Sequence, residues 1–169
     1  MHYDLVRQFA FSLRNLDAML EKTIGHATNK GFDPNNFVTA RLAPDMMPFS
    51  RQVQIACDIA KSTAAALSGT TAPRFEDHEK TIGELQQRIR ATIEYVESFD
   101  AAALSKVTAA SVVPVPYPPG KAMHGKEYVF TRQIPNFYFH VTTAYALLRA
   151  GGVDLGKMDY LGAIVLFDA

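Results

Sequence analysis

Histidine, glutamine and tyrosine side chains on apolar helix faces are the residues of this sequence that could form a binding site. With 100° of rotation per residue, His140 falls inside the apolar stripe of an expected helix, and Tyr145 lies at one edge of that stripe. Gln52 and Gln86 fall at the edges of two other expected stripes. If these edges face one another, the four side chains form a polar pocket that could bind a small molecule.

The same residues have a purely structural interpretation. A lone histidine on an apolar face is more often a core residue whose ring is hydrogen-bonded to a carbonyl or to a glutamine. Gln52 and Gln86 would then be partners of His140 or ordinary surface residues.

The sequence lacks the spacings of common catalytic sites. No two residues show the HxxxH, HExxH or ExxH spacing that places two metal ligands on one helical face, and there is no Gly-rich phosphate loop or GxSxG turn. Cys57, the one cysteine, lies at the margin of an apolar stripe, so we expect a buried, unreactive thiol. His78, Glu79 or His124 could join His140 in a metal site only if a loop brings them to it.

Length and charge exclude several classes of protein. The 169 residues, 48% hydrophobic and 20% charged, suit one globular domain spanning residues 1–169. The 17 basic and 17 acidic side chains cancel, so we expect no binding to nucleic acid or to an anionic membrane surface. No run approaches the roughly 20 apolar residues that span a bilayer, and no secretory signal begins the chain, which favours a cytoplasmic location.

Apolar residues spaced three and four apart predict an all-α fold, a four-helix bundle. Asp45 is the expected N-cap of the second helix. The Thr81–Glu84 pattern predicts a capping box, so the third helix is expected to begin there or one turn earlier. The expected helices cover residues 3–28, 45–67, 81–96 and 135–149.

A proline-rich segment interrupts this pattern before the last long helix. Four prolines between residues 112 and 120 exclude a helix there, and with residues 127–131 they predict a short hairpin or an extended loop. The tail, residues 153–169, is expected to pack back over the bundle, because its apolar side chains need cover: Leu161, Ile164, Val165, Leu166 and Phe167.

Residues 135–149 and 152–162 resemble the signature of an uncharacterised bacterial and fungal family, a domain of unknown function grouped with the DinB/YfiT-like superfamily. Residues 48–52, 79–81, 84–85 and 88–89 are similar to its other short blocks. The resemblance spans nearly the whole chain and implies a four-helix bundle that forms a homodimer.

Typical members of that superfamily resemble metal-dependent hydrolases and thiol-dependent transferases, with one histidine ligand on the second helix and two on the last. Here only His140 matches a ligand position, Thr143 and Ala144 stand where a second imidazole is expected, and the second helix has no histidine. One imidazole with glutamines is a poor zinc or nickel site, so we expect no metal and no cofactor.

Three hypotheses follow. The preferred one is a metal-free bundle that binds a small molecule around His140, and the sequence does not say whether it is also an enzyme. The second is a divergent hydrolase or transferase that uses zinc or nickel. The third is a structural dimerisation module with an aromatic surface at residues 137–139.

Overall fold

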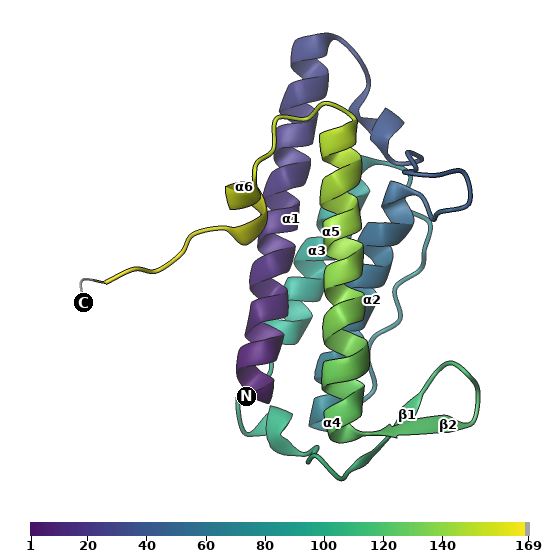
Figure 1. Cartoon of the computed structure of the whole chain (residues 1–169), viewed down its shortest axis with the longest axis vertical. Coiled ribbons are helices and arrows are strands. Elements are labelled where there is room, and N and C mark those ends of the chain that lie inside the picture. Colours follow the sequence, from purple (N-terminus) through teal and green to yellow (C-terminus); the bar gives the residue numbers. More distant parts are fainter. Residues whose placement is uncertain (168–169) are drawn as a thin grey trace.

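Four long helices form the frame of the protein in the computed structural model, which describes residues 1–167. They lie side by side (Figure 1), and contacts between α1 and α3, α3 and α2, α2 and α5, and α5 and α1 close the bundle. Their bounds are α1 His2–Lys30, α2 Phe49–Ser68, α3 Ile82–Glu97 and α5 Ile134–Ala150. All four expected helices are therefore present.

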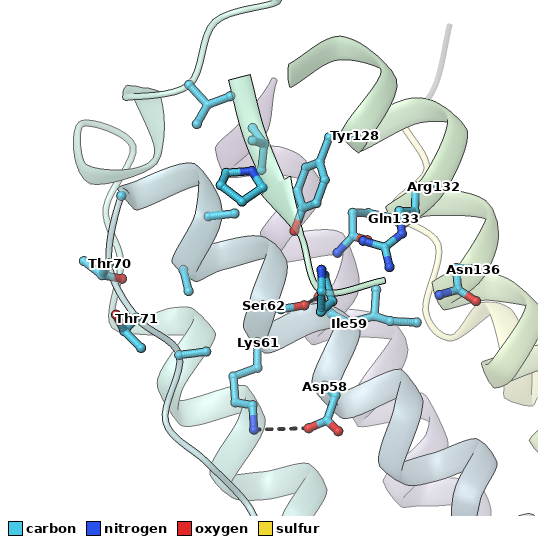
Figure 2. A pocket seen from close by; sticks show the side chains of 18 of the residues that line it. Asp58, Ile59, Lys61, Ser62, Thr70, Thr71, Tyr128, Arg132, Gln133 and Asn136 are labelled. Atoms are coloured by element: carbon cyan, nitrogen blue, oxygen red, sulfur yellow. Dashed lines mark hydrogen bonds and ion pairs between the residues drawn. The ribbon is translucent and has the colours of Figure 1, made fainter. Parts of the chain in front are cut away.

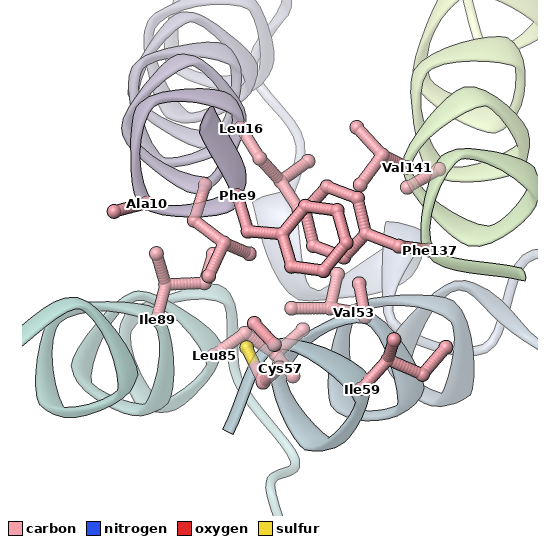
Figure 3. Packing of buried hydrophobic residues seen from close by; sticks show 14 of the residues in the cluster. Phe9, Ala10, Leu16, Val53, Cys57, Ile59, Leu85, Ile89, Phe137 and Val141 are labelled. Atoms are coloured by element: carbon pink, nitrogen blue, oxygen red, sulfur yellow. The ribbon is translucent and has the colours of Figure 1, made fainter. Parts of the chain in front are cut away.

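Stacked aromatic rings occupy the centre of the bundle. Phe9 of α1 and Phe137 of α5 are fully buried, and their ring centroids lie 4.1 Å apart. Figure 3 shows the two rings above Val53 and Cys57 of α2, so all these side chains share one core.

The first turn of α3 confirms the expected capping box. Thr81 Oγ1 accepts from the backbone N–H of Glu84, and the Glu84 carboxylate accepts from the N–H of Thr81. The expected N-cap of α2 at Asp45 is wrong, because α2 begins at Phe49 with Pro48 as its N-cap. The preceding residues form turns, and the Phe49 N–H donates to the carbonyl of Ala40 over 2.9 Å.

The proline-rich segment forms a hairpin, so the protein is mainly helical but not strictly all-α. Strand β1 (Val112–Val115) pairs antiparallel with β2 (Lys121–His124). Two short 3-10 turns, η1 (Pro34–Phe37) and η2 (Ala103–Ser105), lie in the other connections. Among the described residues, no helix is both long and apolar enough to cross a membrane.

The extended conformation expected for residues 127–131 is wrong. After β2 the chain enters α4 (Gly125–Glu127) and the π-helix η3 (Tyr128–Gln133), which continues directly into α5. Val129 is buried against the core, which favours a helix over a free loop. Pro135 has no N–H for the carbonyl four residues earlier, and the wider π turns lie just before it.

The C-terminal segment packs on the bundle only in part. Helix α6 (Lys157–Leu161) lies against α1, where Asp159 pairs with Lys22 over 2.6 Å. Beyond Gly162, at φ 72°, the chain extends away from the bundle (Figure 1), and Ile164–Phe167 are 55–92% exposed. The expected cover for these side chains is therefore absent within residues 1–167, and residues 168–169 of the expected tail lie outside the described residues.

Candidate functional site

A groove of about 1140 Å³ runs along one side of α2. Strand β1, the π-helix η3 and the start of α5 form its other sides, together with the strap, which we define as residues 70–81 between α2 and α3. Ile59 and Ala66 of α2 and Val113 and Pro114 of β1 all line the groove, so it has apolar walls.

The π-helix supplies three polar side chains to this groove. With i→i+5 hydrogen bonding, residues four and five apart lie on one face, which aligns Tyr128, Arg132 and Gln133. Figure 2 shows these side chains together at one end of the groove, beside Ser62. Gln133 Nε2 donates to Thr63 Oγ1 over 2.7 Å, which anchors the π-helix to α2. Burial raises the pKa of Tyr128, although the charge of Arg132 opposes this shift, so the phenol is a neutral hydrogen-bonding group.

Lys61 and Asp58 form the other polar end of the groove. Lys61 Nζ lies 3.1 Å from Asp58 Oδ1 (Figure 2) and 3.9 Å from the centre of the Phe75 ring. Phe75 belongs to the strap, so this cation–π contact helps to hold the strap against α2.

A buried arginine holds the strap to the two helices that it connects. Arg88 of α3 is 4% exposed, and its guanidinium lies 2.9 Å from Asp58, 3.0 Å from Asp77 and 2.9 Å from Glu79. Gln54 Nε2 also donates to Glu79 over 2.7 Å. Asp77 and Glu79 both lie on the strap, so one side chain of α3 fixes the position of this side of the groove.

The charges of this cluster govern the pKa values of the strap carboxylates. Burial alone would raise the pKa of Asp77, but the hydrogen bond and charge of Arg51 and the charge of Arg88 lower it below its ordinary value. Burial alone would likewise raise the pKa of Glu79, but the hydrogen bond that Glu79 accepts from Arg88 lowers this pKa below its ordinary value. Both groups are therefore carboxylates at neutral pH.

His140 lies in a second polar site, against Gln52. His140 Nδ1 is 2.7 Å from Gln52 Oε1, and the ring is 8% exposed. Burial and, to a smaller extent, the nearby charge of Arg51 together lower the pKa of His140 to about 4, so the ring is neutral at neutral pH. The residues lining the groove do not include His140 or Gln52.

The structure brings together two of the four residues expected to form a pocket. Gln86 lies between α3 and α1, where its amide donates to Glu21 over 3.3 Å. Tyr145 packs edge-on against Tyr160, with ring centroids 5.9 Å apart. Neither side chain makes a hydrogen bond to His140 within residues 1–167.

The donor set near His140 does not fit a transition metal. Within the described part of the chain, no three side chains of histidine, cysteine, aspartate or glutamate are grouped so as to hold a metal ion. Glu79 is used by Arg88 and Gln54. Cys57 is buried, as expected, and burial raises the pKa of this thiol to about 12, which makes it a poor metal ligand.

The groove residues were missed by sequence reasoning, although some left a signal. Lys61, which lines the groove, and Arg88, which holds the strap, both fall beside apolar stripe positions, and a charged residue there indicates a buried ion pair. Arg132 and Gln133 carried no such signal, because their alignment depends on a π-helix that helical spacing of 3.6 does not describe.

Residues 1–161 match the sequence profile of the family described as Domain of unknown function (DUF1993). The chain belongs to this family. The crystal structure of a DinB family member protein from Shewanella denitrificans is also similar to it, with 43% sequence identity and a TM-score of 0.92. That similarity covers 99% of this chain and 95% of the other, which confirms the DinB-like resemblance. No protein with curated annotation matches the sequence.

Proposed function

We propose that this DUF1993 protein binds a small molecule, without a metal, in the groove between α2, β1 and η3. The observation that carries the proposal is the groove itself. Its volume of about 1140 Å³ lies at the upper end for small-molecule sites, and its apolar walls carry a few polar groups, as such sites do. The π-helix adds support, since π turns occur frequently at functional sites.

His140 has a different role in this proposal. Its hydrogen bond to Gln52 joins α5 to α2. Both residues are close in sequence to residues that line the groove, but neither lines it. We therefore assign this pair to the relative placement of α2 and α5, whose surfaces form two sides of the groove. A neutral ring with one satisfied nitrogen suits that structural role.

The proposal is tested by NMR chemical-shift mapping of the full chain against a library of small-molecule fragments. We expect fragments to shift amide signals of α2, β1 and η3. The variant Ser62→Trp places an indole from an exposed position into the groove and should abolish these shifts. The matched control is Ala18→Trp, on an exposed position of α1 outside the groove, which should leave them unchanged.

Two results would contradict groove binding. One is fragment shifts that cluster elsewhere, for example around His140 and Gln52. The other is binding that survives Ser62→Trp in a variant whose circular dichroism spectrum is native.

A homodimer and a cytoplasmic location stay predictions. The aromatic surface expected at residues 137–139 is reduced, since Phe137 is fully buried while Phe139 is 55% exposed.

A further inference from the structure

Arg132 is a cation inside the groove without an ion-pair partner among residues 1–167. Figure 2 shows its guanidinium beside Gln133, at the end of the groove that η3 forms, and the side chain is half-buried. The other groove arginine and the buried lysine are paired, Arg74 with Glu76 and Lys61 with Asp58. A half-buried, unpaired guanidinium therefore remains available for an anion.

The groove as a whole carries surplus positive charge. Its lining contains four cations and one carboxylate, Asp58, and Asp58 is shared by Lys61 and Arg88. The four cations are Lys61, Arg74, Lys106 and Arg132. Low-dielectric walls concentrate the field of such a surplus, so a negatively charged ligand is favoured over a neutral or positive one.

Neutral groups beside Arg132 could complete an anion site. Asn136 lies one helical turn after Arg132, lines the groove and makes no side-chain hydrogen bond within the described residues. The Tyr128 hydroxyl also lines the groove, and as a neutral phenol it can donate a hydrogen bond there. An anionic head of carboxylate, sulfonate or phosphate type would find donors of three kinds there.

We infer that the ligand of the groove is an amphipathic anion, with its charged head on Arg132 and its apolar body along α2. The body would lie against Ile59 and Ala66 on one side and Val113 on the other. This inference rests on the proposed function and adds to it the chemical class of the ligand.

The test is isothermal titration calorimetry of the full chain with octanoate, 1-octanol and octylammonium, which share one apolar body. Octanoate should bind most tightly, and raised ionic strength should weaken octanoate alone, because salt screens the contact with Arg132. Octanesulfonate and octyl phosphate then distinguish the possible head groups.

Variants of Arg132 identify the anion contact. Arg132→Met should weaken octanoate by about tenfold or more and leave 1-octanol unchanged, since a hydrogen bond to a charged group is lost. Arg132→Lys should recover part of the affinity. Lys126→Met removes an exposed cation of α4 outside the groove and should have no effect. If Arg132→Met does not fold, Arg132→Gln replaces it.

The outcomes separate the two proposals. Equal or tighter binding of 1-octanol or octylammonium would overturn the anion class, as would an unchanged octanoate affinity in both Arg132→Met and Arg132→Gln. If Ser62→Trp still abolishes 1-octanol binding, small-molecule binding in the groove survives and only the ligand class fails. Binding by none of the three probes also overturns the anion class, and the fragment mapping then decides about the groove independently.

Discussion

His140 Nδ1 lies 2.7 Å from Gln52 Oε1, and the Gln52 amide nitrogen donates in turn to the carbonyl of Met47 over 3.0 Å. Because the carbonyl of Met47 accepts from the Gln52 amide nitrogen, the Gln52 amide oxygen is the atom that faces the histidine. This oxygen can only accept, so the proton of the neutral ring is assigned to Nδ1. Nε2 then carries the lone pair. One hydrogen bond therefore sets both the tautomer of His140 and the contact between α5 and α2.

This pair predicts a pH dependence of stability. The pKa of His140 is about 4 in the folded protein and about 6.5 when unfolded, so the unfolded chain binds a proton that the folded chain excludes. The stabilisation is full above pH 6.5 and is lost as pH falls from about 6.5 to about 4, by at most about 3–4 kcal/mol. Urea unfolding across this window measures it.

The variant His140→Asn isolates this effect. Its side-chain amide can still donate to Gln52 but cannot titrate, so the loss of stability between pH 6.5 and 4.5 should shrink. The matched control is His78→Asn, at an exposed strap position, which should keep the wild-type slope. Identical slopes for His140→Asn and the wild type would contradict the burial of a neutral ring.

Removing Arg88 should be much more costly than removing its neighbour on the same helix. Arg88→Met leaves Asp58, Asp77 and Glu79 without their shared cation, and we expect a loss of about 3–5 kcal/mol in the free energy of unfolding. Arg90→Met breaks one exposed pair with Asp17 and should lose less than about 1 kcal/mol. Denaturant unfolding compares the two, and equal losses would contradict the role of Arg88 in holding the strap.

The strap carboxylates should titrate below their ordinary values. Asp77 and Glu79 have lowered pKa values, so their stabilising contribution is present above the unfolded pKa and is lost as pH falls through the folded one. Carboxyl ¹³C NMR measures both titrations directly. In Arg88→Gln the titrations should move upward, because burial of the carboxylates is then less compensated. Unchanged titrations in this variant would exclude Arg88 as a cause.

Two phenylalanines of α5 should differ sharply in their contribution to stability. Phe137→Ala removes half of the stacked pair with Phe9 and leaves a cavity, at a cost of about 3–5 kcal/mol. Phe139→Ala changes an exposed side chain and should change stability by less than about 0.5 kcal/mol. Thermal unfolding followed by circular dichroism measures both, and similar losses would contradict the core position of Phe137.

Local features were readable in the sequence because they depend on neighbours along one helix. Apolar spacing placed four helices, Thr81 and Glu84 predicted a capping box, and the position of Cys57 predicted a buried thiol. The burial of His140 followed from the same periodicity. Each of these depends on residues within about one helical turn, so tertiary context was not needed.

Tertiary structure alone decided which helix edges face one another and where a groove opens. A helical wheel gives a direction around one helix axis, but packing against other helices selects the neighbour on that side. Gln52 therefore meets His140 between α2 and α5, while Gln86, at a similar edge of its own stripe, meets Glu21 of α1. The groove needed a π-helix and a strap held by Arg88, because its walls come from segments as far apart in the sequence as Ile55 and Asn136.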